Sequence, residues 1–151
     1  MEQLKPRQLD IMQNLAKMLG EKGPVKITTS LLSKECGITE AAIYRHFPSK
    51  RKIYSGLVDF CEKNIFDLIA NINSSDGDEL EKTKKILILL VTFSEKNPGL
   101  ARLLTREAFS VDETSLDERI GQMMSKIELL IKQNLQKYEQ ETKKKLELPT
   151  A

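Results

Sequence analysis

Three consecutive cations, Lys50, Arg51 and Lys52, follow Ser49, a residue type that often precedes the first turn of a helix. The N-terminus of a helix is electropositive, so each cation there costs roughly 0.3 kcal/mol or more unless an anion binds. A phosphate group in this place would contact free backbone N–H groups and ammonium groups together. The spacing therefore indicates an anion-binding helix start, with a solvated basic turn as the alternative.

Two short helices joined by a tight turn are predicted just before these cations. The first is expected at Thr28–Cys36, where a hydroxyl group at the start caps free N–H groups. Gly37 ends it, because glycine adopts a left-handed conformation without strain. Thr39 is expected to cap the second helix, at about Glu40–Phe47. The apolar residues of the pair can share one small core, as in a helix-turn-helix: Leu32, Cys36, Ile38, Ile43 and Phe47.

The second helix of a helix-turn-helix enters the major groove of DNA. Here it would present five side chains to that groove: Thr39, Ala42, Tyr44, Arg45 and His46. The hydroxyl groups of Thr28 and Thr29 would meet phosphates at the start of the first helix, with helix capping alone as an equal alternative. Partial burial under the N-terminal helix is the alternative for Tyr44, and packing on its own helix is the alternative for His46.

Charge is distributed unevenly along the 151 residues, although the net charge is only +2. Residues 1–54 hold ten Lys and Arg residues against five Asp and Glu residues, whereas residues 55–151 hold fourteen against seventeen. The basic part is the part with the expected helix-turn-helix. This distribution favours a polyanionic partner for the N-terminal part.

No set of residues in the sequence indicates catalysis, a metal site or a cofactor. His46 is the only histidine, and no Ser, Cys or carboxylate pattern accompanies it. Cys36 and Cys61 fall on apolar faces of expected helices without zinc-ligand spacing, so we expect both to pack in the core. The sequence has no apolar leader and no apolar run long enough to span a bilayer. We therefore expect a cytoplasmic protein that is not an enzyme.

The whole chain is expected to be all-α, with an N-terminal three-helix helix-turn-helix domain at 1–54 and a C-terminal helical bundle at 55–151. The first helix is expected at about 6–19, and its predicted buried residues are Leu9, Met12, Leu15, Ala16 and Leu19. Further helices are expected at about 50–72, 80–96, 100–109 and 115–145. The segment Ile86–Val91 is entirely apolar, which predicts that its helix is buried around most of its circumference.

The segments Gly37–Thr39 and Ala42–Lys50 resemble the DNA-binding signature of the TetR family: a glycine turn, a tyrosine, an aromatic residue and a lysine that opens the next helix. Ser33 stands where the family commonly has alanine at a close helix contact, and it is small enough to fit. The resemblance implies a homodimer on a palindromic double-stranded DNA site. The implied DNA contacts are Thr28, Thr29, Thr39, Ala42, Tyr44, Arg45, His46 and Lys50.

A second segment, Phe93–Thr105, narrows the resemblance to the nucleoid occlusion factors, TetR-type regulators of bacterial cell division. It implies a nucleoid-associated protein that couples DNA binding to inhibition of FtsZ assembly. The C-terminal tail of FtsZ would bind a groove between the helices at 50–72 and 80–96. Phe60, Lys96 and Asn97 would line this groove, because an exposed aromatic ring beside a cation suits a short acidic and apolar tail. The alternative for Phe60 is a place in the core.

Two other functions stay open on the sequence. A ligand-responsive repressor of the general TetR type needs an enclosed apolar pocket within 55–151, and the dense Ile86–Val91 segment argues that this interior is filled. An interaction module without DNA binding is the second. TetR-type proteins usually dimerise through two further C-terminal helices, and the sequence has no counterpart of them. Either the chain is a fragment, or the helix at 115–145 makes the dimer interface alone.

Overall fold

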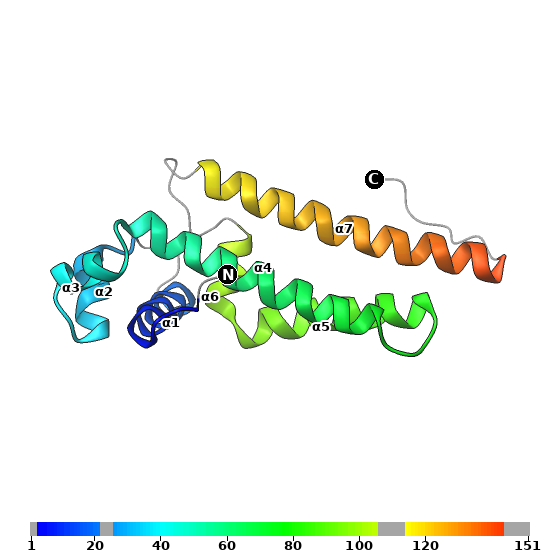
Figure 1. Ribbon diagram of the computed structural model, residues 1–151, viewed down its shortest axis with the longest axis horizontal. Coiled ribbons are helices and arrows are strands. Elements are labelled where there is room, and N and C mark those ends of the chain that lie inside the picture. The colour runs from blue at the N-terminus through cyan, green and yellow to red at the C-terminus, as the bar shows by residue number, and fades with distance from the viewer. Residues whose placement is uncertain (1–2, 22–25, 106–113, 144–151) are drawn as a thin grey trace.

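The computed structural model describes residues 3–21, 26–105 and 114–143, and among these residues it contains helices and no strands (Figure 1). The predicted all-α fold is confirmed. The helices are α1 (Pro6–Glu21), α2 (Thr29–Cys36), α3 (Glu40–His46), α4 (Lys50–Asn73), α5 (Glu79–Lys96), α6 (Pro98–Leu104) and α7 (Thr114–Thr142). The predicted continuations of α6 to residue 109 and of α7 to residue 145 extend outside the described residues.

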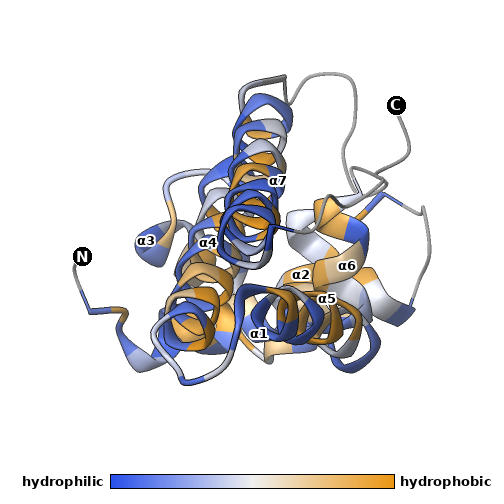
Figure 2. Ribbon diagram, turned by 90° about the vertical axis from the view of Figure 1, so that its right-hand side faces the viewer, coloured by the Kyte–Doolittle hydropathy of each residue, from blue (hydrophilic) through white to orange (hydrophobic). Residues whose placement is uncertain are grey.

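The long helix α4 joins the two halves of the molecule (Figure 1). It contacts α1 on one side of the junction and α5, α6 and α7 on the other. Helices α2 and α3 lie at one end, where they pack on α1. Helix α7 runs along α5 and α4, as the view along these three helices in Figure 2 makes clear. The helix-turn-helix is therefore held at one end of a longer helical body.

The apolar side chains form one continuous core from α1 to α7. Helix α4 contributes a stripe with helical spacing: Ile53, Leu57, Cys61, Ile65 and Ile69. Burial raises the pKa of the Cys61 thiol to about 12, so this side chain is neutral near pH 7. Cys61 therefore packs as a small apolar residue, as expected.

Two predictions of burial are wrong. Leu9 is 38% exposed, because α1 turns a neighbouring stripe to the core: Ile11, Met12, Leu15, Met18 and Leu19. In α5, Leu87, Ile88 and Val91 are 49%, 64% and 59% exposed. The opposite side of α5, with the fully buried Ile86, carries its contact with the core. The apolar segment in α5 is therefore buried on one side only.

Polar contacts attach α7 to its neighbours at both ends. Near its start, Arg119 pairs with Asp59 of α4. Near its end, Lys137 Nζ lies 3.2 Å from Glu79 Oε1, at the start of α5. This hydrogen bond is the main cause of a lowered pKa for the Glu79 carboxyl group and of a raised pKa for the Lys137 ammonium group. The ion pair therefore favours one register of α7 on α5.

Within the described ranges, no helix has the length and apolar character needed to cross a membrane. The same residues contain no cluster of three or more His, Cys, Asp or Glu side chains that could hold a metal ion.

Candidate nucleic-acid interface

Local caps fix the angle between α2 and α3. The N–H of Leu31 donates to Thr28 Oγ1 over 3.1 Å at the start of α2. Gly37 ends the helix in the left-handed conformation, with φ 68° and ψ 30°. The N–H of Ala42 then donates to Thr39 Oγ1 over 3.1 Å at the start of α3. These are the cap residues that the sequence predicts, and they make the turn of a helix-turn-helix.

The small core beneath the turn is also as predicted. Leu32, Ile43 and Phe47 are buried, and Cys36 and Ile38 pack against them while partly exposed. Because Ile43 occupies the inner face of α3 and Phe47 caps its end, the polar residues of this helix point elsewhere.

The residues predicted to contact DNA lie on and around α3. Thr39, Tyr44 and Arg45 are exposed, whereas Ala42 and His46 are partly buried. The phenol of Tyr44 is not under α1: this side chain is 47% exposed, and its hydroxyl donates to Thr29 Oγ1 over 3.3 Å. The structure thus brings Tyr44 of α3 and Thr29 of α2 together at the surface.

The start of α4 has the chemistry of an anion site. Ser49 caps the helix by accepting a hydrogen bond from the N–H of Lys52, over 3.2 Å, and the first turn contains no acidic residue. Lys50 Nζ lies 5.9 Å from the centre of the Tyr54 ring, a distance at which the cation and the ring attract each other. Tyr54 is buried. The ring therefore supports the lysine at the positive end of the helix.

One contact that sequence reasoning missed holds α3 from the side of α1. Gln8 Nε2 donates to the carbonyl oxygen of His46 over 3.2 Å. This carbonyl belongs to the last turn of α3, where carbonyl groups lack partners within the helix. The contact joins residues 38 positions apart, and no local sequence pattern marks such a pair. Gln8 therefore satisfies the end of α3 and fixes its place on α1.

A second missed contact joins α1 to α6. Arg102 Nη1 donates to the carbonyl oxygen of Leu19 over 3.1 Å, in the last turn of α1. Close by, a Cβ built on Gly99 would lie 1.8 Å from the carbonyl oxygen of Ala16. The two backbones therefore meet without an intervening side chain. Helix α1 is in this way attached both to α3 and to the C-terminal part.

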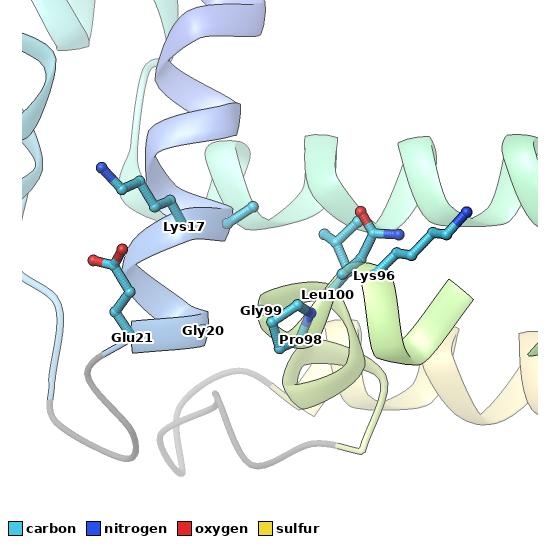
Figure 3. A pocket seen from close by; sticks show the side chains of 9 residues that line it. Lys17, Gly20, Glu21, Lys96, Pro98, Gly99 and Leu100 are labelled. Atoms are coloured by element: carbon cyan, nitrogen blue, oxygen red, sulfur yellow. The ribbon is translucent and has the colours of Figure 1, made fainter. Parts of the chain in front are cut away.

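The three residues expected to bind a protein partner line two separate hollows. Phe60, 39% exposed, lines a groove of about 1010 Å³ between the start of α1 and α4, together with Leu4 and Leu9. Lys96 and Asn97 line a smaller hollow of about 320 Å³ where the end of α1 meets α5 and α6 (Figure 3). Phe60 is therefore not a core residue, and the structure does not bring it into the hollow that Lys96 and Asn97 line.

Family comparisons agree with this architecture. The model described as "Bacterial regulatory proteins, tetR family" matches residues 11–57, and the SlmA-like model described as "Tetracyclin repressor-like, C-terminal domain" matches residues 77–151. The chain is also 44% identical over 133 residues to nucleoid occlusion factor SlmA of Aliivibrio fischeri (strain MJ11), a match that covers 87% of this chain and 68% of that protein. The chain belongs to the TetR family.

A second relative has the same name, and a solved structure has the same fold. Nucleoid occlusion factor SlmA of Shewanella woodyi (strain ATCC 51908 / MS32) is 43% identical over 129 residues, which cover 85% of this chain and 66% of that protein. Among solved structures, the fatty acid degradation regulator FadR of Bacillus halodurans matches with a TM-score of 0.77 at 19% identity, over 98% of this chain and 76% of that one. The second likeness extends to the fold alone. Within the TetR family, this protein is thus a relative of nucleoid occlusion factors.

Proposed function

We propose that this protein binds a specific double-stranded DNA sequence and acts as a nucleoid occlusion factor, a regulator that couples DNA binding to inhibition of FtsZ assembly. The observation that supports DNA binding best is the surface around α3. Tyr44 and Arg45 are exposed on α3, which follows the helix capped by Thr28 and precedes the helix capped by Ser49. A duplex needs base contacts from one helix and phosphate contacts on either side of it.

Each residue has a distinct task in this proposal. Lys50 and the hydroxyl group of Thr28 hold phosphates and set the register of the protein on the duplex. Helix α3 then lies in the major groove, where Thr39 and Tyr44 contact base edges or the sugar-phosphate backbone. Arg45 has the reach and the two-pronged geometry to bind guanine. The hydrogen bond from Tyr44 to Thr29 keeps the two groups of contacts together.

Salt-dependent binding tests the proposal. A palindromic duplex is selected from random sequence with the wild-type protein, and its affinity is measured by fluorescence anisotropy at several salt concentrations beside a scrambled duplex. Lys50→Ala should weaken binding to both duplexes alike and reduce the slope of log K against log salt by about 1. Lys132→Ala is the matched control, because Lys132 is an exposed lysine on α7 paired with Glu128.

Two results would contradict DNA binding of this kind. One is a wild-type protein that binds the selected and scrambled duplexes equally, which would mean that α3 reads no sequence. The other is an unchanged salt slope for Lys50→Ala, which would remove the phosphate contact from the start of α4. Thr39→Ala separates the two tasks, since it should cost more affinity on the selected duplex than on the scrambled one.

The FtsZ part of the proposal rests on the relatives, which are named nucleoid occlusion factors, and on the two hollows beside α1. Phe60 supplies an exposed aromatic surface in one. The other is lined by two cations, Lys17 and Lys96, against one carboxylate, Glu21. An acidic and apolar peptide tail would find a matching group in each. Because α1 lines both hollows and also contacts α3 through Gln8, a shift of α1 on DNA would alter both.

A further inference from the structure

The described lining of the groove beside Phe60 holds more carboxylates than cations. Among the described residues, its charged side chains are Asp59, Lys63 and Asp67. Lys63 Nζ lies 3.5 Å from Asp67 Oδ2, one turn further along α4, so these two charges offset each other. An acidic peptide tail in this groove would therefore meet the carboxylate of Asp59, which the lysine of the described lining does not neutralise.

Arg119 of α7 brings a positive charge to Asp59 from outside the groove. Its Nη2 atom pairs with Asp59 Oδ1 and lies 3.8 Å from Glu62 Oε2, and its Nη1 atom donates to Ser55 Oγ over 3.1 Å. These three α4 side chains follow each other at intervals of four and three residues, so they share the face of α4 toward α7. Arg119 itself lines a separate small hollow between the two helices.

The contacts of Arg119 keep its charge in one place. A guanidinium group is planar and binds two groups at once, and arginine stays charged throughout the pH range in which proteins fold. Two-thirds of the Arg119 side chain is covered, whereas both side chains of the pair between Lys63 and Asp67 are more than half exposed. The charge of Asp59 is therefore offset by a cation that is held on two sides.

We propose that Arg119 determines the charge preference of the groove beside Phe60, because it offsets the charge of Asp59 and so admits a peptide that carries carboxylates. This inference rests on the proposed function, which assigns an acidic and apolar tail to the groove. With Arg119 present, the charges of the described lining and of this arginine sum to zero. Without it, one net negative charge faces the peptide. Arg119 acts through Asp59 and does not need to contact the peptide.

A purely structural role for Arg119 makes a different prediction. The arginine also ties α7 to α4, and loss of this tie alone would alter the groove for every peptide, whatever its charge. Loss of a neutralising charge would alter binding of an acidic peptide only. The charge dependence of binding therefore distinguishes the two roles.

Two labelled peptides measure this dependence by fluorescence anisotropy at low salt: the FtsZ C-terminal tail, and the same peptide with each carboxylate side chain replaced by its amide. Arg119→Gln should lower the affinity for the acidic tail about threefold and leave that for the amide peptide unchanged. Arg119→Lys should keep the wild-type preference, because it keeps the charge although it loses the two-pronged contact. Lys132→Gln is the control for net charge, since Lys132 pairs with Glu128 on α7.

Variants of Asp59 test the same charge from the other side. Asp59→Asn should raise the affinity for the acidic tail about threefold, because Arg119 then leaves a net positive charge beside the groove. The double variant Asp59→Asn with Arg119→Gln should return close to the wild-type affinity, since both charges are removed together. All these differences should shrink at high salt. Circular dichroism melting checks that each variant folds.

Three results would overturn the proposal, and they differ in what else they affect. An equal loss on both peptides in Arg119→Gln would leave only the structural tie between α7 and α4. Unchanged affinity for both peptides would remove any role of Arg119 in the groove, while the FtsZ contact stands. A wild-type protein that binds neither peptide would contradict the FtsZ contact as well, without affecting the proposal of DNA binding.

Discussion

Gly99 of α6 packs directly on the carbonyl oxygen of Ala16 in α1, so closely that a Cβ on Gly99 would lie 1.8 Å from that oxygen. The contact lies between the helix-turn-helix and the C-terminal part, beside the hydrogen bond from Arg102 to Leu19. The only way to accommodate a side chain there is to move one helix backbone away from the other. The position therefore controls how the two parts of the chain meet.

Gly99→Ala should destabilise the protein by about 2–3 kcal/mol, the upper part of the range for an overpacked site, because backbone atoms cannot move aside cheaply. Gly56→Ala is the matched control in a helix. Its Cβ would lie 3.3 Å from the sulfur of the flexible Met12 side chain and at an ordinary contact distance of 3.8 Å from the Phe47 ring. Alanine also favours a helix over glycine by about 1 kcal/mol. Urea unfolding of both variants measures the difference. Equal stabilities would mean that α1 and α6 separate easily.

Gln8→Ala tests whether the end of α3 must be held from α1. Loss of the hydrogen bond to the His46 carbonyl should cost about 0.5–1.5 kcal/mol of stability. If DNA binding is as proposed, it should also lower affinity for the selected duplex more than for a scrambled one. Gln13→Ala is the control, since Gln13 is exposed on the same helix. A Gln8 variant with unchanged stability and unchanged discrimination would show that α3 keeps its place without this contact.

The helix-turn-helix could be predicted from the sequence because its determinants are local. Thr28, Gly37 and Thr39 each act within three or four residues of their own position. The exposed side of α5 could not be predicted in this way. The apolar segment Ile86–Val91 has no helical periodicity, so the packing of α4, α6 and α7 on α5 decides which side is covered.

In the candidate site, too, local contacts could be predicted from the sequence and distant contacts could not. Ser49 caps α4 as predicted, because this hydrogen bond joins residues only three positions apart. Gln8 and Arg102 donate hydrogen bonds to carbonyl groups 38 and 83 positions away. The neighbouring residues in the sequence do not indicate these partners. Phe60 was expected beside Lys96, but Phe60 lines a hollow at the start of α1 and Lys96 lines another at the end of α1.

The ion pair between Glu79 and Lys137 predicts a pH dependence of stability. The pKa of Glu79 is lowered from 4.5, so its contribution is complete above pH 4.5 and is lost as the pH falls through the lowered value. The pKa of Lys137 is raised from 10.5, so its contribution is complete below pH 10.5 and is lost as the pH rises through the raised value. Both contributions are therefore present near pH 7.

Glu79→Gln should accordingly lower the melting temperature by a constant amount across the neutral range, and the difference from wild type should shrink as the solution is made more acidic than pH 4.5. Thermal unfolding at a series of pH values measures this. Glu128→Gln is the control, because its pair with Lys132 is exposed and should contribute little at any pH. A difference that persists unchanged into strong acid would assign the effect to packing rather than to charge.

The last prediction concerns the proposed FtsZ contact, measured by fluorescence anisotropy with a labelled peptide of the FtsZ C-terminal tail. Phe60→Ala should strongly lower the affinity for the peptide, since it removes the exposed ring from the groove beside Leu4 and Leu9. DNA affinity should stay nearly unchanged, because Phe60 lies ten positions after Lys50 in α4, about 15 Å along the helix. Leu129→Ala is the control, a 53% exposed apolar residue on α7.

Lys96→Glu then decides whether one peptide uses both hollows. If one peptide occupies both hollows, Lys96→Glu should also lower the affinity for the peptide. The loss should be larger at low salt than at high salt, because salt screens the lost charge pair. An effect of Phe60→Ala alone would confine the peptide to the groove between α1 and α4. If the wild-type protein does not bind the peptide, with or without the selected duplex, the FtsZ contact is contradicted. The proposal of DNA binding is not affected by this result. The ligand-responsive repressor would then be the better account, since it needs the duplex but no protein partner.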